Sequence, residues 1–408
     1  MVLILFLIHK FHLTLIEFLC TLFIASFTFV LITDIFSKAK CLCLLNKLKK
    51  IQRKIICSIN QNRALDIIGV DRLCIQVNEK LIPIADPDTR GKLLPKIGDL
   101  RKKTVECLGF IIPNIRIHDN TKLIDFEYTI LVNGTVVDGG FVYPNKIMIS
   151  KLECDKLDIS LPEDCIKAIN PIDKTEVYWI NESDIETNKK CLKIDPTDVI
   201  INHLEKIVIK NSNEIMSHSD VKKYIKLVNT QNPELTENFS HDLLSITDLK
   251  TIFTNLITEK ISIKDIISVF EYLNDFARFS QNPDELSEKL RYALRRQIQQ
   301  KYVHDNKVYA ITFSQDTEKQ LETLINHSSD GKRTDFKPIA HVILEVLNNL
   351  EEKIIPVVLV SSKIRLQLYR YLNELIPSIN VISYNELSQK THIEILKEIS
   401  NEHHKIYN

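Results

Sequence analysis

Three short stretches hold residue types that could do chemistry, but none has the spacing that the chemistry needs. Asp86-Pro87-Asp88-Thr89-Arg90-Gly91 begins like a calcium loop and lacks the later ligands of an EF-hand. His118-Asp119-Asn120 offers a His–Asp pair, yet the chain has no Gly-x-Ser-x-Gly elbow to carry a nucleophile. His403-His404, beside Glu402, has no convincing third metal ligand. We interpret the first as a solvated turn and the second as a capping turn, and predict neither a catalytic nor a metal site.

Glycine, cysteine and charge argue against further classes. The chain has only eight glycines, and Gly331 is the only one in the C-terminal hundred residues, so no predicted strand there is followed by a phosphate-binding loop. Its nine cysteines include no CxxC pair, which indicates reduced thiols instead of a disulfide framework or a zinc site. Lys+Arg and Asp+Glu both number 53, so no global field attracts nucleic acid. We predict no cofactor, no nucleic-acid partner and no enzymatic activity.

The N-terminal end predicts a membrane anchor over residues 1–36. Phe18–Thr33 is uncharged, and extending the apolar run back to Phe11 reaches the roughly 20 residues of a spanning helix while including Glu17. Residues 37–66 then form a basic linker with no acidic residue between Phe36 and Ala64. The positive-inside rule places this flank, and the bulk of the chain, in the cytoplasm. A cleaved signal peptide is disfavoured because its basic residues should precede the apolar run.

From Ile67 onward the pattern alternates between short strands and helices. The first stretch predicts strands over Leu73–Val77 and Ile111–Ile117, a helix over Lys92–Leu108, and a hairpin in Tyr128–Val137 at Asn133-Gly134. A second β-rich stretch runs over Ile147–Ile180, and we expect its Trp179 to lie in the core.

The remaining chain predicts a helical region followed by a small α/β unit. Asp195 to about Lys301 has helical spacing, with a helix over Ile261–Phe276 and another opened by Asn282-Pro283-Asp284. The basic clusters Lys96–Lys103 and Arg291–Lys301 fit solvated faces or subunit contacts. The last hundred residues alternate strands with helices, which is typical of a parallel sheet. The strands are expected over Val308–Phe313, Ile355–Val360 and Asn380–Tyr384, and the helices over Thr317–Asn326, Pro338–Leu350 and Lys363–Leu375.

An ordered series of motifs between residues 66 and 400 resembles the cytoplasmic region of the type III secretion export-gate (FHIPEP) family. No single piece is diagnostic, but the ordered set is specific. The motifs include Leu81-Ile82-Pro83, Leu108-Gly109-Phe110, Ile115-Arg116-Ile117-His118-Asp119-Asn120, Asp195-Pro196-Thr197, Asn232-Pro233-Glu234-Leu235, Pro283-Asp284-Glu285-Leu286, Pro356-Val357-Val358-Leu359-Val360 and Ser383-Tyr384-Asn385-Glu386-Leu387.

The resemblance implies an α+β cytoplasmic region of four subdomains after one N-terminal transmembrane helix. The first two are β-rich, the third helical and the fourth a small α/β unit. With our segmentation the expected ranges are 67–210 with an inserted second subdomain at about 125–190, 211–301, and 302–408. The family forms a ring, typically of nine subunits, at the bacterial inner membrane. It receives chaperone–substrate complexes and works with other export-apparatus membrane proteins and the export ATPase complex.

The same resemblance implies a chaperone-docking cleft at Asn170, Pro171, Asp173, Asn202 and His203. Flagellar members of the family carry Asp-Pro-Ala-Phe-Gly where this chain reads Asn170-Pro171-Ile172-Asp173-Lys174. Losing an apolar aromatic of a hot-spot kind removes roughly 2 kcal/mol in typical interfaces. We therefore expect weak or altered recognition of flagellar chaperones.

Several alternatives stay open. The family carries about eight transmembrane helices before this region and the chain offers one, which fits a truncated or split member, or a degenerate remnant that exports nothing. The Ile115–Asn120 stretch favours the flagellar branch, whereas the spacing from His327-Ser328-Ser329-Asp330-Gly331 to Pro338 is closer to virulence (injectisome) members. We favour the flagellar branch narrowly.

Overall fold

The computed structural model describes residues 70–400, except 87, 89–90, 158, 160, 185–190, 238–243, 328–336, 351–353 and 377–378. The chain divides into two compact units after Val70, and the described residues, Val70 apart, all belong to the second. The predicted membrane anchor and basic linker lie outside the described residues, as does His403-His404. Within the described ranges, no helix combines the length and the apolarity that a bilayer crossing requires.

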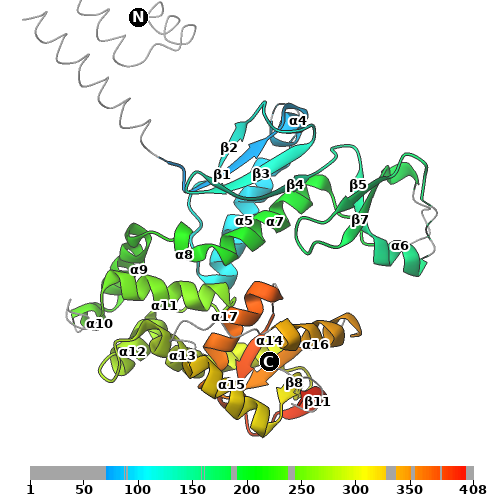
Figure 1. Ribbon diagram of the computed structural model, residues 1–408. Helices are drawn as coiled ribbons and strands as arrows, with labels where there is room; N and C mark the ends of the chain where they lie inside the picture. Colours follow the sequence, from blue (N-terminus) through cyan, green and yellow to red (C-terminus); the bar gives the residue numbers. More distant parts are fainter. Residues whose placement is uncertain are drawn as a thin grey trace, which may run out of the picture. The chain divides into compact units, whose positions relative to one another are not determined.

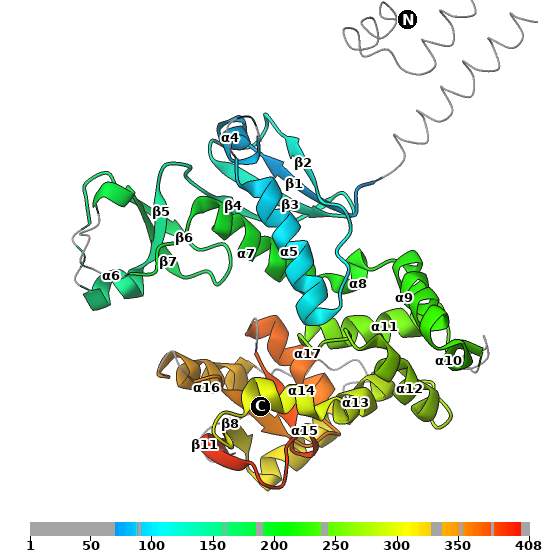
Figure 2. The ribbon, with the colours of Figure 1, turned by 180° about the vertical axis from the view of Figure 1, so that it is seen from behind.

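The first sheet has the strand order β2-β1-β3-β4, with β1 parallel to β2 and the other neighbours antiparallel (Figure 1). Its elements are β1 Leu73–Val77, η1 Glu79–Leu81, α4 Ile82–Ala85, α5 Leu93–Leu108, β2 Arg116–Asp119, β3 Glu127–Val132, β4 Thr135–Phe141 and α7 Pro196–Lys210. Helices α5 and α7 lie side by side against the sheet (Figure 2). Leu73, Ile75 and Ile130 of the sheet share one core with Ile97 and Leu204 of these helices.

The predicted hairpin is confirmed, whereas the second predicted strand begins later than expected. Asn133 and Gly134 adopt φ values of 48° and 77°, the positive values that a two-residue hairpin turn requires. The expected strand over Ile111–Ile117 is wrong for all but its last two residues, because β2 starts only at Arg116. Pro113 has no N–H for a ladder, and the N–H of Ile111 donates to the Tyr224 hydroxyl at 3.2 Å.

A small antiparallel sheet of order β5-β7-β6 lies in sequence between β4 and α7. Its elements are β5 Ile147–Ser150, α6 Lys151–Leu157, β6 Ile166–Ile169, β7 Glu176–Ile180 and η3 Glu182–Asp184. Trp179 is 1% exposed and meets Tyr143 edge-on with ring centroids 5.5 Å apart. Its predicted place in the core is confirmed.

The middle of the chain is helical, as predicted, and side-chain caps set the helix starts. The helices are α8 Ser212–Ile215, α9 His218–Gln231, α10 Pro233–Glu237, α11 Ile246–Thr258, α12 Ile266–Phe276, α13 Pro283–Ala293 and α14 Arg295–Tyr302. Asn282 caps α13 just before Pro283, as the sequence predicts. The helix expected from Ile261 begins only at Ile266, because the Asp265 side chain accepts from the N–H of Ser268 and fixes the N-terminus there.

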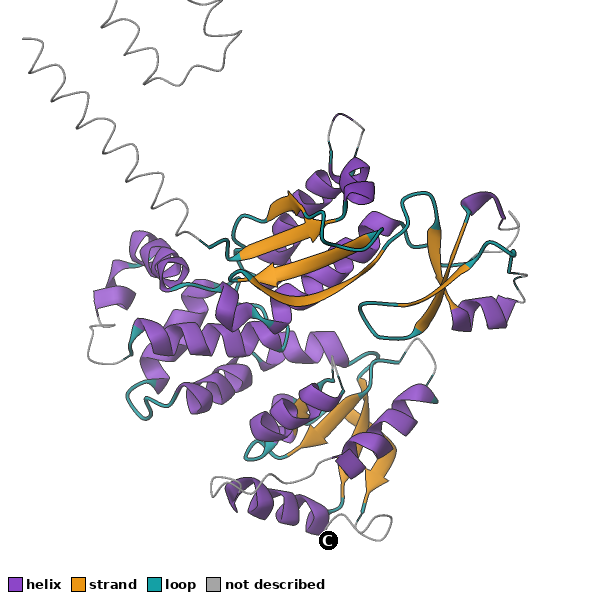
Figure 3. Ribbon diagram, turned by 45° about the horizontal axis from the view of Figure 1, so that its top comes forward, coloured by secondary structure: helices purple, strands orange, loops and turns teal. Residues whose placement is uncertain are grey.

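The C-terminal part is a parallel sheet of order β10-β9-β8-β11 flanked by helices, one of three sheets in the described residues (Figure 3). Its elements are β8 Lys307–Phe313, α15 Gln315–His327, α16 Lys337–Asn348, β9 Val357–Val360, α17 Arg365–Leu375, β10 Val381–Ser383, η5 Tyr384–Glu386 and β11 His392–Ile399. Strand β11 was not predicted. Its polar side chains are typical of an exposed edge. With the sheets above, the predicted α+β class is confirmed for the described residues.

Candidate functional site

The five residues predicted to dock a partner come from two elements that the fold brings together. Asn170, Pro171 and Asp173 lie in the β6–β7 loop, and Asn202 and His203 lie on α7. Lys206 of α7 donates from Nζ to the carbonyl of Ile172, so the loop is held against the helix. The proximity implied by the family resemblance is therefore present in the fold.

The loop itself is a tight turn built by its own polar side chains. Asn170 is buried, its Oδ1 accepts from the N–H of Ile172, and its backbone N–H donates to the carbonyl of Thr175. Asp173 is exposed and accepts from the N–H and the hydroxyl of Thr175 at 3.0 and 2.6 Å. Lys174, with φ of 63°, completes the turn. Asp173 is thus open to a partner, whereas Asn170 shapes the loop.

His203 is fully buried, so its role is internal. Its Nδ1 lies 2.8 Å from the hydroxyl of Tyr128, and its Nε2 lies 3.3 Å from Oδ2 of Asp138. Burial acts to raise the pKa of Asp138, but the Gly139 N–H, His203 and Lys174 outweigh it and hold that pKa below its usual value. In the tautomer that carries its proton on Nε2, His203 turns that proton toward the carboxylate and accepts at Nδ1 from the Tyr128 hydroxyl. The arrangement fixes α7 to β3 and β4 under the loop.

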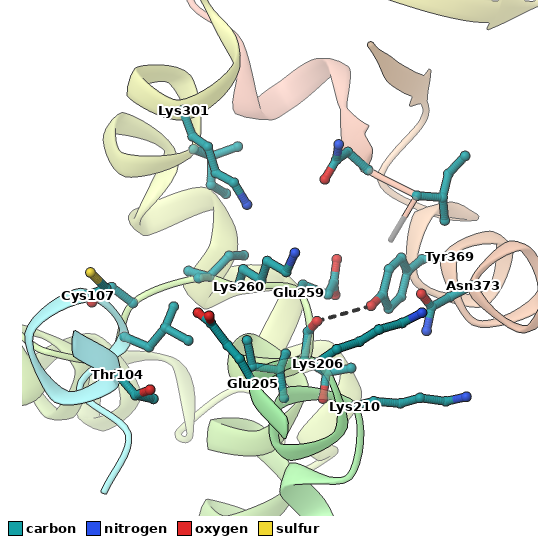
Figure 4. Close-up of a pocket in the computed structure, with 18 of the residues that line it drawn as sticks. Thr104, Cys107, Glu205, Lys206, Lys210, Glu259, Lys260, Lys301, Tyr369 and Asn373 are labelled. Carbon is teal, nitrogen blue, oxygen red and sulfur yellow. Dashed lines mark hydrogen bonds between the residues drawn. The ribbon is translucent and has the colours of Figure 1, made fainter. Parts of the chain in front are cut away.

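Exposed Asn202 and the half-buried Ile172 line a cleft of about 580 Å³. Figure 4 shows other residues of its lining, among them Lys206, Lys260 and Lys301. Residues of α5, α7, the segment after α11, α13, α14, α17 and β10 complete its lining. Five lysines and one arginine face two glutamates there, a formal excess of four positive charges. The lysines are Lys103, Lys206, Lys210, Lys260 and Lys301. We call this cavity the lysine cleft.

Burial changes the electrostatics of the lysine cleft. Burial, together with the charges of Lys260 and Arg291, lowers the pKa of Lys301 to about 8 against the opposing effect of Glu259. Burial, with Lys174 and Lys210, also lowers the pKa of Lys206. Tyr369 lines the same cavity and donates from its hydroxyl to the carbonyl of Thr258 at 3.3 Å. Of the lysines in the cleft, Lys206 and Lys301 are therefore partly removed from water, whereas Lys103, Lys210 and Lys260 are exposed.

Sequence reasoning missed this cleft. The solvated faces or subunit contacts predicted for Lys96–Lys103 and Arg291–Lys301 do not include it. A solvated face is wrong for Arg291, which is 3% exposed, and Lys301 is partly removed from water. The lysines come from α5, α7, α14 and the turn after α11, and apart from Lys206 and Lys210, four residues apart on α7, no local spacing relates them. The turn after α11 places Lys260 at the cleft with a positive φ of 57°, which its residue type does not predict.

The other stretches singled out for chemistry have structural partners. His118 of β2 lies with Nε2 at 3.5 Å from Oδ2 of Asp71, and Asn120 accepts from the N–H of Lys122, the predicted capping turn. Across the ranges that the structure describes, no group of His, Cys, Asp and Glu side chains could hold a metal ion.

The profile of the FHIPEP family matches residues 2–392. Among curated proteins, the chain is 25% identical over 341 residues to "Flagellar biosynthesis protein FlhA" of Bacillus subtilis, covering 81% of this chain and 50% of the relative. It is 28% identical over 342 residues to the protein of the same name from Salmonella typhimurium, covering 82% and 48%. The chain spans about half the length of these relatives.

Solved structures share the fold. The MxiA protein of Shigella flexneri superposes with a TM-score of 0.61 at 22% identity, covering 81% of this chain and 99% of that one. CdsV in the Chlamydia pneumoniae CdsV and CdsO complex gives 0.67 at 21%, covering 81% and 97%. The nonameric EscV cytosolic domain from the type III secretion system gives 0.60 at 20%, covering 81% and 97%.

Proposed function

The chain belongs to the FHIPEP family, and from that premise we propose that it is the docking platform of a flagellar-type protein-export apparatus. The observation that carries the proposal is the family match, which takes in nearly the whole sequence from residue 2 to residue 392. The matched curated relatives are flagellar biosynthesis proteins, which favours the flagellar over the virulence branch. No catalytic role is part of the proposal.

In this proposal the β6–β7 loop and the exposed side of α7 receive chaperone–substrate complexes and pass them to the export channel. Asp173 and Asn202 are exposed there, whereas His203 and Asn170 hold the surface from beneath. Because His203 is enclosed by Tyr128 and Asp138, its part in docking is to position α7. Further partners are the membrane proteins and the ATPase complex of the same apparatus.

The architecture follows the same family. The proposal divides the chain into a first subdomain over 67–210 with a β-rich insertion at about 125–190, a helical subdomain over 211–301 and an α/β subdomain over 302–408. Residues 1–36 anchor the chain in the bacterial inner membrane and 37–66 link it to the cytoplasmic part. A ring of nine subunits is supported by the nonameric EscV domain, which has the same fold.

The test is direct binding by the full 408-residue chain. A flagellar export chaperone from the same genome, loaded with its substrate, should bind more tightly than the chaperone alone in biolayer interferometry. Mass photometry of the solubilised chain should reveal nonamers. Failure of every loaded chaperone to bind, from a chain that is folded by circular dichroism, overturns the proposal.

A further inference from the structure

The lysine cleft holds positive charge that the described part of the chain does not neutralise. Lys103 pairs with Glu205 at 2.9 Å, and Glu259 is taken by Arg291 and Arg365. No carboxylate among the described residues pairs with Lys210, Lys260 or Lys301. These three amines come from α7, the turn after α11 and the last turn of α14, and Figure 4 shows them around one opening.

Holding Lys301 in this position is energetically costly. The side chain is partly desolvated and lies close enough to Lys260 and Arg291 for both to disfavour its charge. A carboxylate entering the cleft would remove that cost, because an opposite charge within about 4–6 Å favours the protonated amine. The cleft is therefore arranged to gain free energy from an incoming anion.

The uncharged residues that line the cleft indicate which class of anion fits it. No glycine lines the cleft, so the close backbone cradle typical of phosphate and nucleotide sites is missing. Apolar side chains stand between the lysines, including Ile172, Ile209 and Ile261. A volume of about 580 Å³ suits a few residues of extended chain. Carboxylates with an aliphatic side chain between them match both features.

Neither the basic segment 37–64 nor residues 401–408 have the composition of such a segment. Residues 37–64 carry eight basic and no acidic side chains, so the cleft repels them. Residues 401–408 carry one glutamate against one lysine. Charge complementarity therefore favours a separate protein.

We propose that the lysine cleft binds an acidic segment of a protein partner, in which at least two carboxylates flank an aliphatic side chain. Lys210, Lys260 and Lys301 receive the carboxylates, and Ile172 and Ile209 contact the aliphatic group. Because Ile172 belongs to the β6–β7 loop, a segment bound in the cleft also contacts the docking surface. The inference rests on the docking function proposed above and names a second point of contact for it.

The test uses the full chain and a fluorescein-labelled peptide in which glutamates flank a leucine, read by fluorescence anisotropy. Two control peptides carry glutamine for glutamate, or serine for leucine. The glutamate–leucine peptide should bind, both controls should bind at least about tenfold more weakly, and added salt should weaken binding.

Protein variants locate the site. Lys210→Glu changes an exposed side chain and should leave folding intact, while Lys301→Gln removes the desolvated amine. Together they should weaken binding about tenfold or more, whereas Lys222→Glu, on an exposed face of α9, should change it less than about twofold. Equal binding of the glutamate and glutamine peptides, or full binding by the double variant, overturns the inference.

The binding experiments distinguish failure of the docking function from failure of the acidic-segment site. If loaded chaperones bind the wild type and both lysine variants equally and the peptide does not bind, the docking function stands and the acidic-segment site does not. If the peptide binds through the lysines and no loaded chaperone binds, the site stands and the docking function falls.

Discussion

Glu259 and Arg365 form a buried bidentate ion pair between the turn after α11 and helix α17. Nη1 of Arg365 lies 2.6 Å from Oε2 and Nη2 lies 3.0 Å from Oε1 of the carboxylate. The side chain of Arg365 is 0% exposed and that of Glu259 is 6% exposed. Arg291 of α13 donates to the same Glu259 at 2.7 Å and to Glu386 of η5 at 2.7 Å. One buried network thus joins the helical middle of the chain to its C-terminal sheet.

Breaking this network from one side should cost much of the chain's stability. Arg365→Met leaves the buried Glu259 and the partly buried Glu288 with one guanidinium fewer, and loss of a buried ion-pair partner typically costs about 3–5 kcal/mol. The control is Arg370→Gln, which removes a half-exposed pair with Asp284 and should cost about 0–1 kcal/mol. Urea unfolding followed by circular dichroism measures both. Equal costs for the two variants would contradict the buried role of Arg365.

His203 should make stability depend on pH. Burial lowers its pKa, and Asp138 only partly offsets that effect. The unfolded chain therefore binds a proton at His203 more readily than the folded chain does. Stability is present above the unfolded pKa of about 6.5 and is lost as pH falls from there toward the lower folded pKa.

Urea unfolding at a series of pH values between about 5 and 8 measures this slope. His203→Gln should flatten it, because the titrating group is gone. Replacing the exposed His392 in the same way should leave the slope in place. A wild-type chain as stable at the lower end of the range as at the upper end would rule out the proposed linkage.

Much of the fold was predictable because its signals are local. The turn at Asn133-Gly134 needs two positive φ values, which those residue types accept at little cost, and the cap at Asn282 with Pro283 defines a helix start within a few residues. Strand β11 lacks such a signal. Its polar residues His392, Glu394 and Lys397 are typical of a loop, and only the parallel pairing with β8 makes this segment a strand.

The candidate site was predictable only through the family resemblance, and then only in part. His203 is one polar residue on an amphipathic helix, and its partner Tyr128 is 75 positions away, so nothing in the sequence reveals that it is buried. The lysine cleft is harder still. The sequence around Lys206, Lys260 and Lys301 is typical of surface lysines. Their side chains line one cavity only because three elements distant in sequence pack against one another.

Lys301 should be an unusually reactive lysine. With a pKa of about 8, roughly half of its side chain is unprotonated at pH 8, against below about 1% for an ordinary lysine. Brief acetylation, quantified by peptide mass spectrometry across a pH series, should show Lys301 labelling that levels off above about pH 8–9. The glutamate–leucine peptide should protect it. Labelling that keeps rising steeply to pH 10 would contradict the lowered pKa.

Two glycines, one without room for a Cβ and one with open space around it, give a matched stability test. Gly109 ends α5 with φ of 70°, and a Cβ there would lie 2.6 Å from the backbone nitrogen of Lys264. Gly98 lies within α5, and a Cβ there meets nothing within 4 Å. Gly109→Ala should therefore destabilise by more than about 1 kcal/mol, and Gly98→Ala should stabilise by about 0.5–1 kcal/mol. Thermal unfolding measures both signs, and a stabilising Gly109→Ala would refute the close contact.

The exposed carboxylate of Asp173 should limit the affinity for flagellar chaperones. The family resemblance implies an aromatic side chain in this stretch of flagellar members, and Asp173 of the β6–β7 loop is exposed. Asp173→Phe should raise the affinity for a loaded flagellar chaperone by about 2 kcal/mol, roughly thirtyfold, since buried aromatic anchors contribute on this scale. Isothermal titration calorimetry on the full chain measures the change. Asp173→Asn keeps the hydrogen bonds to Thr175 without adding apolar area, and should change the affinity little. Strong chaperone binding by the wild type that neither substitution alters would show that this loop position does not contact the chaperone.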